Sequence, residues 1–515
     1  MSGSGVFLCA FECESCTRGG VPLSLSHVLL QKASPLARPT GTHSASRYQA
    51  SLLEGPVLGS LLKLSIPIVL ANILQSGYQL IDAFWVGRLG GHAVAAVSVS
   101  FPVTFLLIAL GSGFSMAGST LVAQHMGAGN HHRVNQVAGQ TILLVVVTSL
   151  SLSLIGILLA PGLLGLLGVE EAVYDAALVF LRISMAAMVF TFGFSMFQAL
   201  MRGVGEVRLP LYIVTGTVLL NVVLDPLFIF GFNLGVGGAA LATLVTQALA
   251  LGTGLWLLVR GRHGIVLKGH DLRPDPVFIR RALSLGLPAS VELSARALGM
   301  NVMVFLVTGF GTVTIAAYGV GTNIMAFVII PALGLSMSTA ALVGQNIGAG
   351  QIERAGRIAR LSALIALVSL SVIGLVVFTF ARQLVAFFVP GDEAIIEAGS
   401  HFLHITSLTF GFIGAQMALT GVFRAAGHTV VAMLLALVSQ WVLQFPLAFI
   451  LSRDTVMGVD GIWWAFPVTN MVTALIALIL FMRGDWQKGR LAEREDPLSA
   501  QVSDEIISKG PGPSA

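Results

Sequence analysis

The sequence predicts an all-α integral membrane protein with twelve transmembrane helices in two six-helix lobes. Two observations lead to this prediction: the composition is unsuited to water, and one half of the chain repeats in the other. Of the 515 residues, 55% are hydrophobic and only 10% are charged, and the mean hydropathy is +0.89. Because so few polar side chains cannot cover a soluble protein of this size, lipid must be the main solvent.

Apolar stretches long enough to cross a bilayer, about 20 residues each, recur along most of the chain. Glycine, proline and charged residues separate one stretch from the next. The spans predicted in this way are 61–86, 94–118, 137–160, 174–200, 209–232, 236–259, 282–308, 314–342, 358–380, 396–420, 428–451 and 460–482.

Basic residues set the expected orientation, because loops rich in Lys and Arg stay on the cytoplasmic side. The connections that follow even-numbered spans carry most of these residues, and the opposite loops carry few. The flanking bases include Arg133, Arg202, Arg208, Arg260, Arg262, Lys268, Arg273, Arg280, Arg281, Arg354, Arg357, Arg360 and Arg424. Both termini are therefore expected in the cytoplasm, which for a bacterial protein means insertion in the inner membrane.

Internal repetition is the strongest organisational signal. Segments of the first half recur in the second half at a nearly constant spacing, and each pair shares its glycines, prolines or polar residues. The pairs are Val122–Gly129 with Val343–Gly350, Leu64–Pro67 with Leu285–Pro288, and Arg202–Gly205 with Arg424–Gly427. Since each half has an even number of spans, the copies enter the membrane in the same direction. This predicts a V-shaped, alternating-access arrangement of two lobes.

The expected boundaries follow from this repeat and from composition. Residues 1–55 and 483–515 are polar or charged and are expected to be disordered. Residues 56–259 form the N-lobe, 260–281 a cytoplasmic linker, and 282–482 the C-lobe. All three cysteines lie in the first segment, at Cys9, Cys13 and Cys16. A metal site there is disfavoured, because a fourth ligand and a folded frame are lacking.

The sequence also resembles the MATE (multidrug and toxic compound extrusion) family. Pro67–Asn72 and Ile81–Gly90 are similar to the family's opening helix and the turn after it, and the two Gln-x-x-Gly-Ala-Gly segments at 124–129 and 345–350 resemble its glycine-rich cytoplasmic loops. The resemblance covers about residues 58–482 and is closer to the branch typified by the DNA-damage-inducible protein. It implies a secondary exporter of toxic organic compounds.

Few ionisable residues lie within the predicted spans, where an unpaired charge is costly. Asp82 and Asp225 lie at a similar depth, roughly 24–27 Å along helices that run in the same direction. Asn221 is one turn from Asp225, and Thr243 reaches a comparable depth on the next span. The resemblance implies that these four residues form the coupling site of the N-lobe. Oxygen ligands of this kind suit Na+, and a pair of carboxylates suits H+ equally well.

Structural interpretations of the same residues remain open. Asp82 can simply mark a helix end, and Asn221 and Thr243 can bond only to neighbouring helices. In the repeat, Asp82 falls on Met303 and the Asp225–Pro226 pair falls on Phe445–Pro446. We therefore expect ion coupling in the first lobe alone.

Glu292 and Arg296 are the remaining charged pair within a span. Their spacing of four residues places them on one helix face, so an ion pair is favoured over a substrate site. If Arg296 pointed elsewhere, Glu292 would be free to meet a cationic substrate.

Other function classes are weaker. No H-E-x-x-H, G-x-S-x-G or Walker sequence occurs, so neither an enzyme nor an ATP-driven pump is expected, and no cofactor is expected beyond the coupling ion. A flippase for lipid-linked oligosaccharide or a cell-wall precursor is the main alternative. Such a protein needs basic residues in its cavity to bind phosphate, and Arg182 and Arg296 are the obvious internal candidates. A channel or a scaffold is a more distant one. We expect a monomer whose substrates are small organic cations, with no role for nucleic acid.

Overall fold

The computed structural model describes residues 52–491 except 167, 262 and 454–456. Within these residues the structure is helical and contains no strand. Eleven helices are long and apolar enough to cross a membrane, and the bent pair α12 and α13 makes a twelfth span if counted as one. The helices of the first half are α2 (Val57–Gly87), α3 (Gly91–Gly127), α4 (His131–Leu166), α5 (Glu171–Val204), α6 (Arg208–Pro226) and α7 (Gly235–Arg260). Those of the second half are α8 (Pro276–Thr308), α9 (Thr312–Gly348), α10 (Ile352–Thr379), α11 (Ala381–Phe388), α12 (Glu393–Ser407), α13 (Phe410–Ala425), α14 (Thr429–Leu437), α15 (Phe445–Leu451) and α16 (Val459–Arg483).

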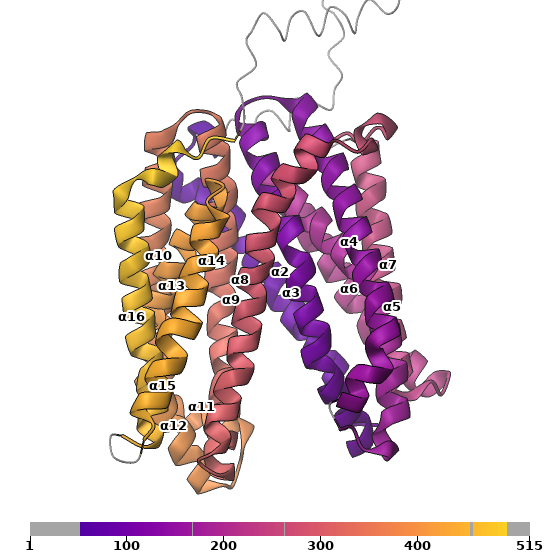
Figure 1. The fold of residues 1–515 in the computed structure, drawn as a ribbon, viewed down its shortest axis with the longest axis vertical. Helices are drawn as coiled ribbons and strands as arrows, with labels where there is room; N and C mark the ends of the chain where they lie inside the picture. The colour runs from indigo at the N-terminus through magenta and orange to yellow at the C-terminus, as the bar shows by residue number, and fades with distance from the viewer. Residues whose placement is uncertain (1–51, 167, 262, 454–456, 492–515) are drawn as a thin grey trace, which may run out of the picture. The chain divides into compact units, whose positions relative to one another are not determined.

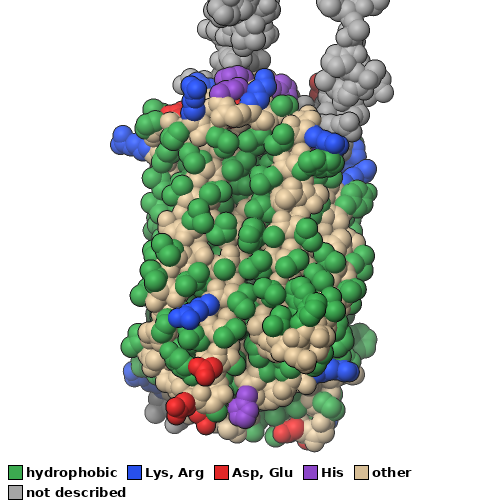
Figure 2. All heavy atoms as spheres, turned by 90° about the vertical axis from the view of Figure 1, so that its right-hand side faces the viewer, with side chains coloured by type: hydrophobic (Ala, Val, Ile, Leu, Met, Phe, Trp, Pro, Cys, Tyr) green, Lys and Arg blue, Asp and Glu red, His purple; other side chains and the backbone are tan. Residues whose placement is uncertain are grey.

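The outer surface matches a lipid environment. Hydrophobic side chains cover the middle of the face in Figure 2, and charged side chains gather mainly towards its two ends. Leu154, Leu158 and Phe305 are examples of large apolar side chains that stay more than half exposed. Exposed apolar surface on this scale is stable only against hydrocarbon, so the chain is a multi-pass membrane protein.

The helices form two groups, which Figure 1 shows as the indigo-to-magenta and the rose-to-yellow ribbons. The core of the first group is formed mainly by α3, α4 and α5, with Phe192 and Phe197 fully buried. The second group has two buried clusters along α9, α10, α13 and α16. The expected division into two six-span halves therefore describes the main packing.

At one end, the halves exchange their first helices. The start of α2 packs in the core of the second half through Leu61 and Leu64. The start of α8 packs in the core of the first half through Ala282 and Leu285. Leu64 and Leu285 belong to one of the repeated segment pairs, so the exchange follows the internal repeat.

The two crossings made by these helices are equivalent. Gly113 of α3 lies against Ser290 of α8, and Gly334 of α9 lies against Val69 of α2. In the repeat, Gly334 is the counterpart of Gly113, and Ser290 is the counterpart of Val69. Glycine allows these close helix approaches because it has no Cβ.

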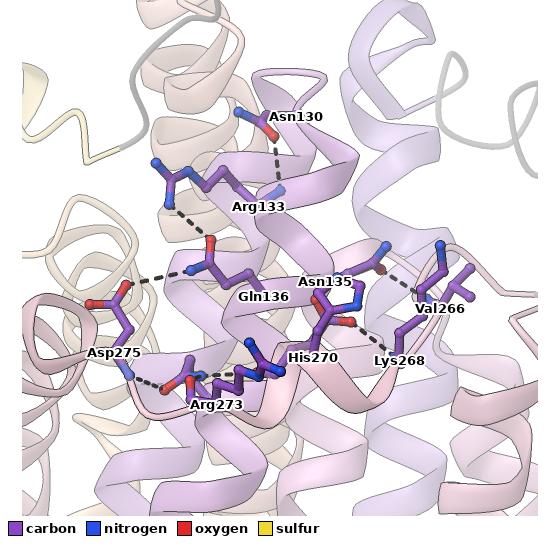
Figure 3. Close-up of polar contacts among 11 residues, drawn as sticks. Asn130, Arg133, Asn135, Gln136, Val266, Lys268, His270, Arg273 and Asp275 are labelled. Carbon is purple, nitrogen blue, oxygen red and sulfur yellow. Dashed lines mark hydrogen bonds and ion pairs between the residues drawn. The ribbon is translucent and has the colours of Figure 1, made fainter. Parts of the chain in front are cut away.

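The connection between the halves is fixed to α4, as Figure 3 shows. Gln140 on α4 donates to the carbonyl oxygens of Asp271, at 2.9 Å, and Arg273, and accepts from the backbone N–H of Asp275 at 3.0 Å. Asn135 accepts from the backbone N–H of Val266 at 2.8 Å. The expected linker 260–281 is thus a docked segment that includes a short 3₁₀ turn, Gly269–Leu272, and the first turn and a half of α8.

Several expectations from the sequence need correction. The tenth span is not one straight helix, because α12 and α13 meet at 51° around Leu408 and Thr409. Residues 1–55 and 483–515 were expected to be disordered, but residues 52–55 and 483–491 pack against the helices. Leu52 and Trp486 are buried, and Arg354 donates to the carbonyl oxygen of Gly55 at 2.6 Å. The cysteine segment lies outside the described residues.

Candidate functional site

The four residues predicted for ion coupling come together from three helices of the first half. The Thr243 hydroxyl of α7 donates to Asp82 Oδ2 of α2 at 3.3 Å, and Asn221 Nδ2 donates to Asp225 Oδ1 on α6 at 2.9 Å. Asp82 also lies close enough to interact with the Asp225 and Asn221 side chains. Asn221 and Asp225 are fully buried, whereas Asp82 and Thr243 are partly exposed. We refer to these four residues as the carboxylate cluster.

Three oxygens of the carboxylate cluster are buried without a hydrogen-bond partner among the described residues: Asp82 Oδ1, Asn221 Oδ1 and Asp225 Oδ2. Among the described residues, no lysine, arginine or histidine forms an ion pair with Asp82 or Asp225. A buried acceptor without a partner costs about 1–3 kcal/mol, and more when it is charged. These oxygens are therefore suited to a small cation or to protons.

Tyr78, which was not among the predicted site residues, contacts the carboxylate cluster. Its hydroxyl donates to Thr243 at 2.9 Å and lies 3.2 Å from the Thr246 hydroxyl. Tyr78 therefore orients Thr243, which in turn donates to Asp82. Its position one turn before Asp82 on the same helix face was the available signal.

The helix that holds Asp225 changes its hydrogen-bonding pattern next to this residue. Pro226 ends the α-helical part of α6, and Leu227–Gly231 continue as a π-helix rather than as a loop. Proline cannot donate a backbone hydrogen bond, and π segments are common at functional sites in helices. The predicted span 209–232 is thus one continuous span, Arg208–Gly231, whose helix geometry changes after Pro226.

The second half has no equivalent pair of carboxylates. Met303, the counterpart of Asp82, is a buried hydrophobic residue in the core of that half. Phe445 takes the place of Asp225, and a π-helix, Val438–Gln444, precedes Pro446 there. Each half therefore has a π-helix next to its proline, but only the first half has a carboxylate beside that proline.

Glu292 forms the ion pair with Arg296 that its spacing predicted, with 3.5 Å between Arg296 Nη2 and Glu292 Oε1. Arg424 of α13 binds the same carboxylate through two nitrogens, one of them Nε, which is 3.2 Å from Oε2. The Glu292 side chain is 1% exposed, and the two arginines bind both of its oxygens. Because two arginines share one carboxylate, the cluster carries one excess positive charge. The pairing of Arg424 with Glu292 was not predicted, because a basic residue at a helix end is typical of a cytoplasmic loop.

The two Gln-x-x-Gly-Ala-Gly segments meet where the halves exchange helices. Gln124 Nε2 donates to the carbonyl oxygen of Ala425 at 2.7 Å, and Gln345 Nε2 donates to that of Gly203 at 2.8 Å. Each glutamine thus reaches from its own half to the end of a helix in the other half. We call these two reciprocal hydrogen bonds the glutamine latch.

Two glycines allow the latch to close. A Cβ on Gly127 would overlap the carbonyl oxygen of Gln345, and a Cβ on Gly348 would overlap that of Gln124. Both obstacles are backbone atoms, which cannot move aside as a flexible side chain would. The first glycine of each repeated motif, Gly127 or Gly348, is therefore required by the contact between the two halves.

The end of the described chain crosses the latch. Gln124 accepts from the backbone N–H of Leu491 at 2.6 Å and donates to the carbonyl oxygen of Gly489 at 3.1 Å. Arg490 donates to the carbonyl oxygen of Gly348 at 3.3 Å, and Arg281 donates to that of Leu491 at 2.8 Å. We call residues 485–491 the C-terminal strap, because they bind both halves at once.

Two duplicated sets of membrane-spanning helices are joined reciprocally at one end, and the first set holds a pair of carboxylates for which the described residues supply no ion-pair partner. These features define a two-lobed membrane transporter. The chain belongs to the MatE family, whose model matches residues 67–227 and 288–450, one match in each half.

Relatives and solved structures agree with this assignment. The chain is 29% identical over 419 residues to the probable multidrug resistance protein YoeA of Bacillus subtilis, a match that covers 80% of this chain and 90% of YoeA. It is 27% identical over 440 residues to the FAD transporter of Shewanella oneidensis, covering 84% of this chain and 96% of that one. It also shares its fold, at a TM-score of 0.81 and 24% identity, with a structure described as the outward-facing conformation of a multidrug resistance MATE family transporter. That match covers 85% of this chain and 98% of the other.

Proposed function

We propose that this protein is a secondary active exporter that moves organic compounds out of the cell in exchange for H+ or Na+. The observation that carries the proposal is the set of three buried oxygens without partners in the carboxylate cluster. Because two carboxylates without basic partners are expensive to bury, a bound cation or proton stabilises them. Release of that ion would leave the buried carboxylates uncompensated and raise the free energy of this conformation. Such a dependence of conformation on the bound ion is what coupled transport requires.

Either ion fits the donor set. Two carboxylates, an amide oxygen and a hydroxyl are hard ligands suitable for Na+, and the same carboxylates can share protons. Asp82 is partly exposed whereas Asp225 is fully buried, so an ion would reach Asp82 before Asp225.

The glutamine latch supports alternating access. It joins the two halves at the end where the linker and the strap lie, and transport would require this end to open. Since that end carries most of the basic loops, we assign it to the cytoplasm, with both termini inside and the protein in the bacterial inner membrane. The conformation with the latch closed would then face outwards.

Small organic compounds, expected to be cationic, are the substrates that we propose, and the working unit is a monomer. The description of YoeA as a probable multidrug resistance protein supports this class, and the FAD transporter shows that a relative carries an anionic nucleotide instead. The flippase alternative is weaker, because Arg296, one of its two candidate phosphate ligands, is paired with Glu292.

Ethidium export from proteoliposomes tests the proposal. Transport would be driven by an imposed proton or sodium gradient and compared between the wild type, Asp225→Asn and the control Asp460→Asn. Asp460 lies in the second half, about half exposed, and pairs with His401. We expect gradient-driven export in the wild type and the control and its loss in Asp225→Asn. Wild-type export that is independent of both gradients would disprove ion coupling, and FAD in place of ethidium tests for an anionic cargo.

A further inference from the structure

A pocket of about 710 Å³ lies at the ends of α10 and α16, beside the C-terminal strap. Arg357 and Arg360 of α10 line one part of it. Leu478 and Met482 of α16 line another, and Trp486 of the strap contributes a further wall. A second pocket of about 520 Å³ shares Arg357 with the first and adds Arg354, so three arginines follow one another along this face of α10.

The arginines that face the first pocket are largely available for a ligand. Within the described part of the chain, Arg357 pairs with Glu353 alone, at 3.7 Å, and both side chains are more than two-thirds exposed. Such a pair contributes about 0–1 kcal/mol, so a stronger anion can displace it. Among the described residues, Arg360 bonds only to the carbonyl oxygen of Gly356 in its own helix, which leaves its two terminal nitrogens without a partner.

The apolar side of the pocket faces the membrane. Leu478 is 44% exposed and Met482 is 75% exposed, in the last two turns of a membrane-spanning helix. Basic residues next to exposed apolar residues at the end of a span match the boundary between lipid head groups and acyl chains. A soluble phosphate would use only the arginines, whereas a phospholipid would cover both surfaces.

We propose that this pocket binds the head group of an anionic phospholipid, and that the bound lipid holds the C-terminal strap over the glutamine latch. The link between the two is Trp486, which is buried at the pocket wall and stacks on Phe481 with 5.3 Å between ring centroids. Three residues further on, Gly489 accepts the hydrogen bond from Gln124. A lipid that fixes the start of the strap therefore stabilises the closed latch. This proposal depends on neither the coupling ion nor the cargo.

Fluorescence of the full-length protein in nanodiscs tests the binding site. Brominated phosphatidylglycerol and brominated phosphatidylcholine are compared as quenchers, and Trp486→Phe identifies the part of the signal that comes from Trp486. We expect stronger quenching of Trp486 by the anionic lipid, reduced severalfold in Arg357→Gln/Arg360→Gln. The matched control Arg382→Gln/Arg453→Gln removes two exposed charges elsewhere and should quench as the wild type does.

Three results would overturn the lipid site. These are equal quenching by both lipids, selective quenching that persists in Arg357→Gln/Arg360→Gln, and loss of quenching when inorganic phosphate is added at millimolar concentration. The last of these would assign the arginines to a soluble anion. Thermal melting of each variant shows whether it is folded.

Hydrogen–deuterium exchange tests the effect on the strap. We expect slower exchange of residues 485–491 in phosphatidylglycerol than in phosphatidylcholine for the wild type and for the control pair. Arg357→Gln/Arg360→Gln should abolish this difference. Exchange that is the same in both lipids in the wild type would refute the stabilising role of the lipid.

Discussion

Gln124 and Gln345, which occupy matching positions of the internal repeat, make the same hydrogen bond in opposite directions. Each donates its side-chain amide to a backbone carbonyl at the end of a helix in the other half, Ala425 for Gln124 and Gly203 for Gln345. The two acceptors are also counterparts in the repeat, so a duplicated sequence motif has become a symmetric contact. Because both bonds must break for the halves to separate here, they contribute to the stability of the closed state in the proposed transport cycle.

Replacing the glutamines should favour the state that is open at this end. A neutral hydrogen bond contributes about 0.5–1.5 kcal/mol, so Gln345→Ala should shift the equilibrium by roughly two- to tenfold, and Gln124→Ala/Gln345→Ala by more. Spin labels at His132→Cys and Val430→Cys, in a background without the three native cysteines, would report the distance between the halves. Gln136→Ala, which removes an amide that bonds to Arg133 of α4 and to Asp275 of the linker segment, is the control. An unchanged distance distribution in the double variant would contradict the latch.

Gly127 and Gly348 allow a sharper test, because they act through contact with backbone atoms of the other half. Gly127→Ala should keep the halves apart, at a cost of about 1–3 kcal/mol for the overlap with the Gln345 carbonyl. We expect a larger population of the open state and slower export, with little change in expression. Gly216→Ala is the matched control, because no atom lies within 4 Å of the added Cβ. Normal export by Gly127→Ala would show that the close approach is dispensable.

The Tyr78 hydroxyl offers a test of the proposed coupling site that leaves both carboxylates in place. Tyr78→Phe removes the donor to Thr243, and Thr243 is then no longer oriented towards Asp82. The loss of about 0.5–1.5 kcal/mol should raise the ion concentration needed for half-maximal export by roughly two- to tenfold. Tyr212→Phe, an exposed tyrosine on α6, is the control. An unchanged ion dependence would indicate that Tyr78 only fills space.

Hydropathy and the glycine, proline and charged residues between apolar stretches were sufficient to predict the spans. A bilayer requires a similar length and an apolar composition of every helix that crosses it. The bend around Leu408 and Thr409 was not predictable, since both residues fit an apolar helix. The π-helix after Pro226 was also missed, because hydropathy predicts the span 209–232 but not how its turns adjust around the proline.

The carboxylate cluster was predictable because charged residues are rare in membrane helices, so Asp82 and Asp225 stood out by depth alone. Only part of the glutamine latch could be predicted from the sequence. The repeated motif identified Gln124 and Gln345, but their acceptors are backbone carbonyls, which have no sequence signal. The pairing of Arg424 with Glu292 was missed for a related reason, since the two are 132 residues apart in the chain.

Substitutions in the Glu292 cluster should lower stability most where they leave a buried charge without its partner. Glu292→Gln leaves Arg296 and Arg424 close together without their shared carboxylate, and removing one partner of a buried ion pair typically costs about 3–5 kcal/mol. Arg296→Gln should cost less, because Arg424 still binds both oxygens of Glu292 and the Arg296 side chain is 30% exposed. Glu353→Gln, at an exposed pair, should have little effect. Melting temperatures from intrinsic tryptophan fluorescence would rank the three variants. If Arg296→Gln proved as damaging as Glu292→Gln, the Arg424 contact would not be the main stabilising interaction of this cluster.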